Sequence, residues 1–120
     1  MSRRMRRVNE LLREELARQI ARLKDPRLSS GLVSITEVET SADLGTARVF
    51  VSVLAGPEEQ ERTVQALNQA SGFLRRALGD ALALKRIPRL QFILDRSLER
   101  GARLSALMDR LMHPPEGEGA

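Results

Sequence analysis

The sequence predicts an α+β domain in which helices cover one face of a three-stranded sheet. Apolar residues recur at helical spacing in two long segments, residues 2–24 and 57–84. Alternating and β-branched apolar residues mark three short segments, residues 32–40, 46–54 and 89–94. The predicted order is helix, strand, strand, helix, kink, helix, strand, helix. One sheet beneath the helices is the simplest way to bury every apolar stripe.

The first predicted helix spans residues 2–24. Ser2 can cap its N-terminus. Asp25-Pro26-Arg27 ends it, because the residue before a proline is disfavoured in helical geometry. The apolar stripe that we expect to face the core consists of Val8, Leu11, Leu12, Leu16, Ile20 and Leu23.

The three predicted strands each place alternate residues on one face. In the first, Val33 and Ile35 share a face, and Ser41-Ala42-Asp43 after it predicts a turn or bulge. In the second, Phe50 lies opposite Val49, Val51 and Val53. In the third, residues 90, 92 and 94 alternate with residues 91 and 93.

The long helical segment starts with Gly56-Pro57-Glu58-Glu59, because proline suits a first helical turn and acids suit the positive end of the helix dipole. Ala70-Ser71-Gly72 interrupts it before the pattern resumes to about residue 84. A glycine inside a helix costs about 1 kcal/mol relative to alanine. We therefore expect Gly72 to supply the backbone angles that redirect the chain between two helices.

The C-terminal part of the chain predicts one more helix and a tail. Ser97 is expected to cap this helix. Its packing face would be formed by Leu98, Leu104, Leu107, Met108 and Leu111. We expect residues 1–112 to form the folded domain and residues 113–120 to be disordered.

Composition excludes several classes of protein. The chain has 120 residues, which is the size of one domain, and it has no cysteine, so disulfides, zinc–thiolate sites and thiol catalysis are absent. No apolar run approaches the roughly 20 residues that span a bilayer. No apolar segment follows the N-terminal arginines, as a signal peptide would require. The expected location is the cytoplasm, without membrane association.

The net charge is +4, and the positive charge is concentrated in residues 1–24 and 73–89. This distribution is typical of a face that binds a polyanion, although ordinary solvated helix surface is the alternative. The candidate RNA-binding residues of the two segments are Arg3, Arg4, Arg6, Arg7, Arg75, Arg76, Lys85, Arg86 and Arg89.

Each group of candidates also has a structural interpretation. The N-terminal arginines could simply solubilise a helix tip. The kink could serve only to let Phe73 and Leu74 reach the core, while Arg75 and Arg76 face water. Arg27 could contact a phosphate, but we expect it rather to pair with Asp25 and stabilise the turn.

Aromatic residues and catalytic patterns are scarce. Phe50, Phe73 and Phe92 are the only aromatics, and we expect all three to pack in the core. Recognition of RNA by shape and phosphate position is then more plausible than base stacking. The lone His113 lies beside two prolines, Asp95 and Glu99 are spaced as helix-start residues, and no nucleotide-binding glycine motif occurs. We expect a non-enzymatic protein without cofactor or metal.

Several strings resemble the ribosome-binding factor A family, in the family's order and over about residues 4–112. In the first half they are Arg6-Arg7-Val8-Asn9, Asp25-Pro26-Arg27, Val33-Ser34-Ile35-Thr36-Glu37-Val38, Ser41-Ala42-Asp43-Leu44 and Ala47-Arg48-Val49-Phe50-Val51-Ser52-Val53. In the second half they are Ala70-Ser71-Gly72-Phe73-Leu74-Arg75, Pro88-Arg89-Leu90-Gln91-Phe92 and Asp95-Arg96-Ser97-Leu98-Glu99-Arg100-Gly101.

The resemblance implies a type II KH-like domain with an Ala-x-Gly kink, here Ala70, Ser71 and Gly72, in place of the Gly-x-x-Gly loop of true KH domains. It also implies late maturation of the small (30S) ribosomal subunit. The implied partners are immature 30S subunits, 16S rRNA during processing of its 5′ end, and a GTPase that acts in release. Growth in the cold and a monomeric state are further expectations. A general KH-like RNA-binding module or a basic protein-interaction module remains the alternative.

Overall fold

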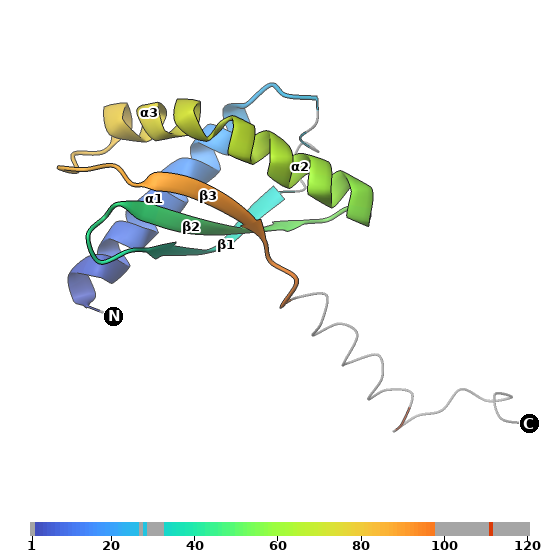
Figure 1. The fold of residues 1–120 in the computed structure, drawn as a ribbon, viewed down its shortest axis with the longest axis horizontal. Coiled ribbons are helices and arrows are strands. Elements are labelled where there is room, and N and C mark those ends of the chain that lie inside the picture. Colours follow the sequence, from blue (N-terminus) through green and yellow to red (C-terminus); the bar gives the residue numbers. More distant parts are fainter. Residues whose placement is uncertain (1, 27, 29–32, 98–110, 112–120) are drawn as a thin grey trace, which may run out of the picture.

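The chain folds in the order α1 (Arg3–Arg22), β1 (Val33–Thr40), β2 (Thr46–Val53), α2 (Pro57–Gln69), α3 (Ser71–Ala81) and β3 (Arg89–Leu94) (Figure 1). The structure is a computed structural model that describes residues 2–26, 28, 33–97 and 111. Within these residues the predicted α+β class and element order are confirmed. The expected last helix and tail, and the domain boundary at residue 112, lie outside the described residues, apart from residues 97 and 111.

Helix α1 begins and packs largely as its sequence predicts. The Ser2 hydroxyl accepts a hydrogen bond from the Met5 backbone N–H at 3.1 Å, and the helix ends at Arg22, two residues earlier than expected. Leu11 corrects the predicted stripe, because it is 38% exposed. Two polar residues, Asn9 and Glu15, are buried instead. The apolar residues of α1 that do reach the core are Val8, Leu12, Leu16 and Ile20.

Asn9 and Glu15 each have hydrogen-bond partners, which makes their burial tolerable. The Thr40 hydroxyl donates to Asn9 Oδ1 at 2.6 Å, which joins α1 to the end of β1. Glu15 accepts hydrogen bonds from Arg18 and Gln19 on its own helix, at 2.9 and 2.8 Å. These bonds hold the pKa of the Glu15 carboxyl below its ordinary value, with the Gln19 bond the larger cause.

The sheet has the strand order β1-β2-β3, with β2 antiparallel to β1 and parallel to β3. The parallel pairing of β2 and β3 requires a long crossover, which α2 and α3 provide. The register between β1 and β2 shifts between Ile35 and Glu37, as in a β-bulge. The inward face of β2 is fully apolar and consists of Ala47, Val49, Val51 and Val53.

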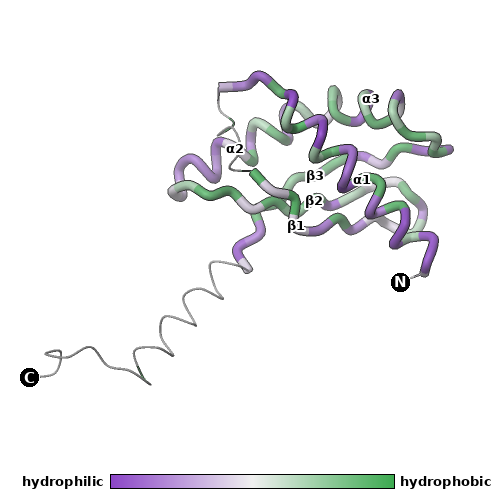
Figure 2. The backbone as a smooth tube through the Cα atoms, turned by 180° about the vertical axis from the view of Figure 1, so that it is seen from behind, coloured by the Kyte–Doolittle hydropathy of each residue, from purple (hydrophilic) through white to green (hydrophobic). Residues whose placement is uncertain are grey.

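The helices lie on one face of the sheet. Helix α1 contacts β1 and α3, and α2 and α3 both contact β3. In Figure 1 the strands lie in front of α1, and in the opposite view of Figure 2 α1 crosses in front of the strands. In the described part of the chain the other face of the sheet is uncovered, and Arg48, Arg89 and Gln91 are exposed on it.

Phe50 lies on this uncovered face and is only half-buried, so the expectation that it packs in the core was wrong. Alternation along β2 explains this position, because Val49 and Val51 occupy the inward face. The Arg48 guanidinium lies 5.7 Å from the centroid of the Phe50 ring, within the range of a cation–π contact. Phe92, by contrast, is 2% exposed and belongs to the core.

The break between α2 and α3 falls at Ala70, whose φ and ψ are −86° and 0°. Gly72 lies one residue inside α3, and a Cβ built on it would have no heavy atom within 4 Å. The fold therefore does not require glycine at this position, contrary to the sequence-based expectation. Helix α3 also ends at Ala81 rather than near residue 84, because Leu82 adopts an extended conformation.

Candidate nucleic-acid interface

The two basic segments meet at one end of the domain. A surface cavity of about 610 Å³ lies between the first turn of α1, the β1–β2 turn and the loop from α3 to β3. Arg4 from the first segment and Lys85 from the second both line it. In Figure 1 the start of α1, the β1–β2 turn and the α3–β3 loop all lie at the same end of the molecule.

Backbone pairing holds the β1–β2 turn beside the α3–β3 loop. The Arg89 N–H donates to the Gly45 carbonyl at 2.9 Å. Thr46, which begins β2, is opposite Arg89, which begins β3, in the parallel ladder. Because these strands start side by side, the turn before β2 and the loop before β3 are necessarily neighbours.

The β1–β2 turn is held by its own side chains. The Ser41 hydroxyl donates to Asp43 Oδ1 at 2.7 Å and accepts from the Gly45 and Thr46 N–H groups at 3.1 and 3.0 Å. The Gly45 N–H also donates to Asp43 Oδ1 at 2.9 Å. The Ser41 hydroxyl, then the Gly45 N–H and the nearby Arg86 charge, hold the pKa of Asp43 below its ordinary value.

The basic side chains at this end are exposed. We refer to this surface as the basic end, and it consists of Arg3, Arg4, Arg6, Arg7, Lys85, Arg86 and Arg89. On α1 these arginines alternate with Met5, which is half-buried, and Val8, which is buried. Apolar residues thus anchor the helix start, while its arginines face solvent.

Arg75 and Arg76 lie on α3 and do not line the cavity. Arg75 Nε donates to the Ile87 carbonyl at 3.0 Å, so this side chain ties α3 to the loop that carries Lys85 and Arg86. Arg76 is exposed. The sequence predicts both residues either as RNA-binding residues or as arginines that face water, whereas the structure gives Arg75 a contact within the fold. Arg27 lies outside the described residues.

Phe73, the residue after Gly72, is 56% exposed, whereas Leu74 is fully buried. The expectation that Phe73 packs in the core was therefore wrong. In the first turn of α3 only one direction faces the sheet, and Leu74 occupies it together with Leu78 one turn later.

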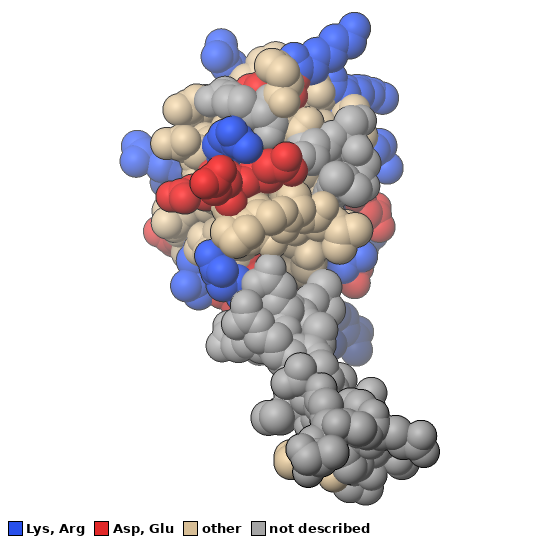
Figure 3. Space-filling model, turned by 90° about the vertical axis from the view of Figure 1, so that its right-hand side faces the viewer, with Lys and Arg blue, Asp and Glu red and all other residues tan. Residues whose placement is uncertain are grey.

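The opposite end of the domain is acidic. Glu58 and Glu59 lie in the first turn of α2 and Glu61 follows, all three exposed. Figure 3 looks onto this side and shows a band of acidic side chains across it. The net positive charge of the chain is thus unevenly distributed, and the basic end is the part that suits a polyanion.

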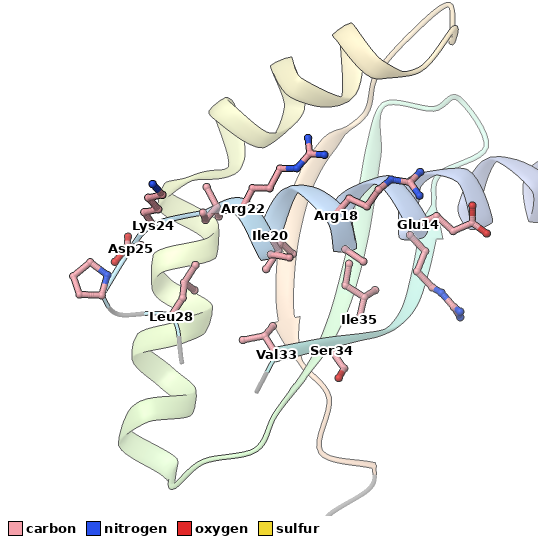
Figure 4. Close-up of a pocket in the computed structure, with 15 residues that line it drawn as sticks. Glu14, Arg18, Ile20, Arg22, Lys24, Asp25, Leu28, Val33, Ser34 and Ile35 are labelled. Carbon is pink, nitrogen blue, oxygen red and sulfur yellow. The ribbon is translucent and has the colours of Figure 1, made fainter. Parts of the chain in front are cut away.

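A larger cavity of about 1230 Å³ lies between the second half of α1, residues 23–26 and 28, and the start of β1. Figure 4 shows Ile20, Leu28 and Val33 around it, with Arg22 and Lys24 at its margin. The sequence had not singled out these two basic residues. Residues 29–32, which join its walls along the chain, lie outside the described residues. The cavity with Arg4 and Lys85 is therefore the candidate site.

The described residues contain neither a cluster of metal ligands nor a helix that could cross a membrane. Among residues 2–26, 28, 33–97 and 111, no three or more His, Asp or Glu side chains are grouped so that they could hold a metal ion. No helix in the same residues combines the length and hydrophobicity that crossing a bilayer requires.

The three-stranded sheet, the paired helices of the crossover and the exposed basic end define a small α+β domain of the KH-like class. Residues 4–108 match the family model described as ribosome-binding factor A. The chain belongs to this family, as its resembling strings predicted.

Relatives and solved structures agree with this assignment. The chain is 42% identical over 116 residues to ribosome-binding factor A of Gloeobacter violaceus, covering 95% of this chain and 90% of the relative. A solution NMR structure of a Thermotoga maritima protein described as a putative ribosome-binding factor A has a TM-score of 0.72 and 34% identity, covering 82% of this chain and 93% of that one.

A second similar structure concerns a complex. It is a homology model of Thermus thermophilus ribosome-binding factor A, fitted into the cryo-EM map of a complex between the 30S subunit and ribosome-binding factor A. Its TM-score is 0.58 at 28% identity, and the alignment covers 81% of this chain and 97% of that one.

Proposed function

We propose that this protein is a non-catalytic assembly factor that binds the small (30S) ribosomal subunit and its precursors during late maturation. The basic end contacts 16S rRNA and stabilises one local conformation of it, and the factor acts during processing of the 5′ end of that RNA. The observation that carries this proposal is the meeting of Arg4 and Lys85 at one cavity, which combines the two basic segments into one surface.

Family membership and the 30S complex of the Thermus thermophilus relative support the ribosomal ligand. The charge distribution supports the basic end as the surface that contacts this ligand. Phosphate oxygens are the ligands that exposed arginines and lysines bind best in a large RNA. An acidic end, by contrast, would be repelled by rRNA, so the protein would dock with its basic end inward.

Release of the protein from the subunit follows from its preference for one RNA conformation. A factor that stabilises one RNA conformation leaves when another conformation is favoured. We propose that a GTPase partner, which the family resemblance implies, supplies this change, since no nucleotide-binding glycine motif for such a step occurs in this sequence. The protein would act as a cytoplasmic monomer. The cell would need it most during growth in the cold.

Co-sedimentation with immature 30S subunits, mature 30S subunits and free 16S rRNA across a salt series tests the proposal. The informative variants are Arg4→Glu and Lys85→Glu, and Arg62→Glu is the matched control, an exposed arginine on α2 beside the acidic end. We expect tightest binding to immature subunits. The plot of log affinity against log salt has a negative slope, and each lost phosphate contact makes that slope less steep by about 0.7 to 0.9.

Each other outcome has a definite meaning. Equal affinity for every RNA would replace the proposal with a general RNA-binding module. Subunit binding that is insensitive to Arg4→Glu and Lys85→Glu would indicate a protein-interaction module. Cleavage of RNA by the purified protein with Mg²⁺ would contradict a non-catalytic role.

A further inference from the structure

The cavity at the basic end has a floor that phosphate binding does not require. Four large apolar side chains line it beside two alanines, namely Met5, Val8, Leu44 and Leu84. Val8 is buried and the other three are half-buried. Arg4, Asp43 and Lys85 are exposed residues of the same lining. A phosphate contact alone would need only the cations.

Leu44 provides an independent observation. Its φ is +59°, and within the described residues it is the only non-glycine residue with positive φ. This left-handed conformation costs an L-residue roughly 1–2 kcal/mol. Such strain tends to persist where a ligand site benefits from it. Here it places an apolar side chain on the cavity floor, in a turn that Ser41 and Asp43 hold rigidly.

The volume of the cavity, about 610 Å³, is within the range of small-ligand sites, roughly 300–1,000 Å³. An apolar floor suits the face of an unstacked base, and two cations at the rim suit the phosphate that accompanies it. The ionised Asp43 carboxylate repels a second phosphate and can accept a hydrogen bond from an amino group.

We propose that this cavity takes one unstacked RNA nucleotide whose base carries an exocyclic amine, with Arg4 and Lys85 on its phosphate. The proposal rests on the proposed function in that RNA is taken as the ligand of the basic end. It goes further in that the protein reads the base of a single nucleotide. Adenine, cytosine and guanine are favoured over uracil, because uracil has only its ring N3–H and no exocyclic amine to donate to Asp43.

The direct test is a titration of methyl-labelled and ¹⁵N-labelled protein with AMP, UMP and inorganic phosphate, followed by NMR. AMP is expected to shift the methyl signals of Met5, Val8, Leu44 and Leu84. Phosphate is expected to shift only signals near Arg4 and Lys85. Loss of one hydrogen bond predicts an affinity for UMP that is lower by about threefold to tenfold.

Two alanines near the end of α3 provide a matched pair of variants. Ala83 lines the cavity, whereas Ala81 does not, and both are exposed. Ala83→Phe should block the AMP-induced methyl shifts, and Ala81→Phe should leave them unchanged. Methyl shifts that are the same for AMP and phosphate, or that persist in Ala83→Phe, would overturn the proposal and leave an anion-binding surface only.

Subunit binding separates this proposal from the proposed function. If a base inserts, Ala83→Phe weakens co-sedimentation with 30S precursors and leaves its salt slope unchanged, because the variant removes no cation and Arg4 and Lys85 can still contact backbone phosphates of the RNA. If Ala83→Phe binds subunits as tightly as the wild-type protein does, the nucleotide site is overturned and the proposed function is not. Wild-type protein that binds no subunit would overturn the proposed function, whatever AMP does.

Discussion

The side chain of Asn68 forms a reciprocal pair of hydrogen bonds with the backbone of Phe92. Asn68 Nδ2 donates to the Phe92 carbonyl at 3.0 Å, and the Phe92 N–H donates to Asn68 Oδ1 at 2.8 Å. Strand β3 pairs with β2 on one side only in the described residues. The Asn68 amide therefore takes the place of a neighbouring strand's peptide group on the other side, and ties α2 to this edge.

Asn68→Ala should lower the free energy of unfolding by about 1–2 kcal/mol, because it removes both bonds from a backbone position next to the core. Gln65→Ala is the control, since Gln65 is exposed on the same helix. Denaturant unfolding compares the two variants. If they are equally stable, the Asn68 bonds add nothing beyond what water would supply.

Arg75 and Arg76 should behave differently when replaced by alanine. Arg75→Ala removes the bond from Nε to the Ile87 carbonyl. It should lower stability by about 0.5–1 kcal/mol, since that bond is exposed to solvent. Arg76→Ala should change stability by less than about 0.5 kcal/mol, as for most surface substitutions. Thermal unfolding measures both effects, and equal losses would mean that Arg75 does not hold the loop.

Asp43 should titrate below its ordinary pKa of 3.8, because the Ser41 hydroxyl, the Gly45 N–H and Arg86 favour its ionised form. Stability from this group is present above the unfolded pKa and is lost as pH falls through the lower folded pKa. Carboxyl ¹³C NMR should give a midpoint that moves up toward 3.8 in Ser41→Ala. A wild-type midpoint at or above 3.8 would contradict the hydrogen-bonded turn.

Gly72→Ala should raise the free energy of unfolding by about 0.5–1 kcal/mol, since alanine is the better helix former. The added Cβ has open space around it. Gly45→Ala is the contrasting variant, because its Cβ would lie 3.1 Å from an Asp43 carboxylate oxygen, and it should destabilise the turn. A loss of stability in Gly72→Ala would show that the break between α2 and α3 needs glycine after all.

Local pattern accounts for the elements that the sequence predicted well. The bounds of β3 at residues 89–94 and the start of α2 at Pro57 agree with the structure. The buried valines of β2 follow directly from alternation along the strand. On the helices, local pattern wrongly predicted that Leu11 and Phe73 are buried, because both lie at the margin of an apolar stripe. Rotation of a helix by a few degrees decides such residues, and packing sets that rotation.

The candidate site also has features that the sequence predicts and features that it does not. Residue type and clustering were enough to single out both basic segments, and composition was enough to exclude thiol chemistry. The cavity could not be anticipated, because Arg4 and Lys85 are far apart in the chain. Their segments meet only through the packing of α1 on β1 and α3 and the parallel pairing of β2 with β3. Nor does local pattern distinguish Arg75 from Arg76, because the bond to Ile87 depends on where the loop runs.

By itself, the sequence determined which segments are helices and strands, which residues of the strands face inward, and where positive charge is concentrated. These properties depend on periodicity and composition over a few neighbouring residues. Only the tertiary structure decided that the two basic segments form one surface around an apolar-floored cavity, with Leu44 turned into it. Contacts between distant residues depend on strand register and helix packing, which local sequence does not encode.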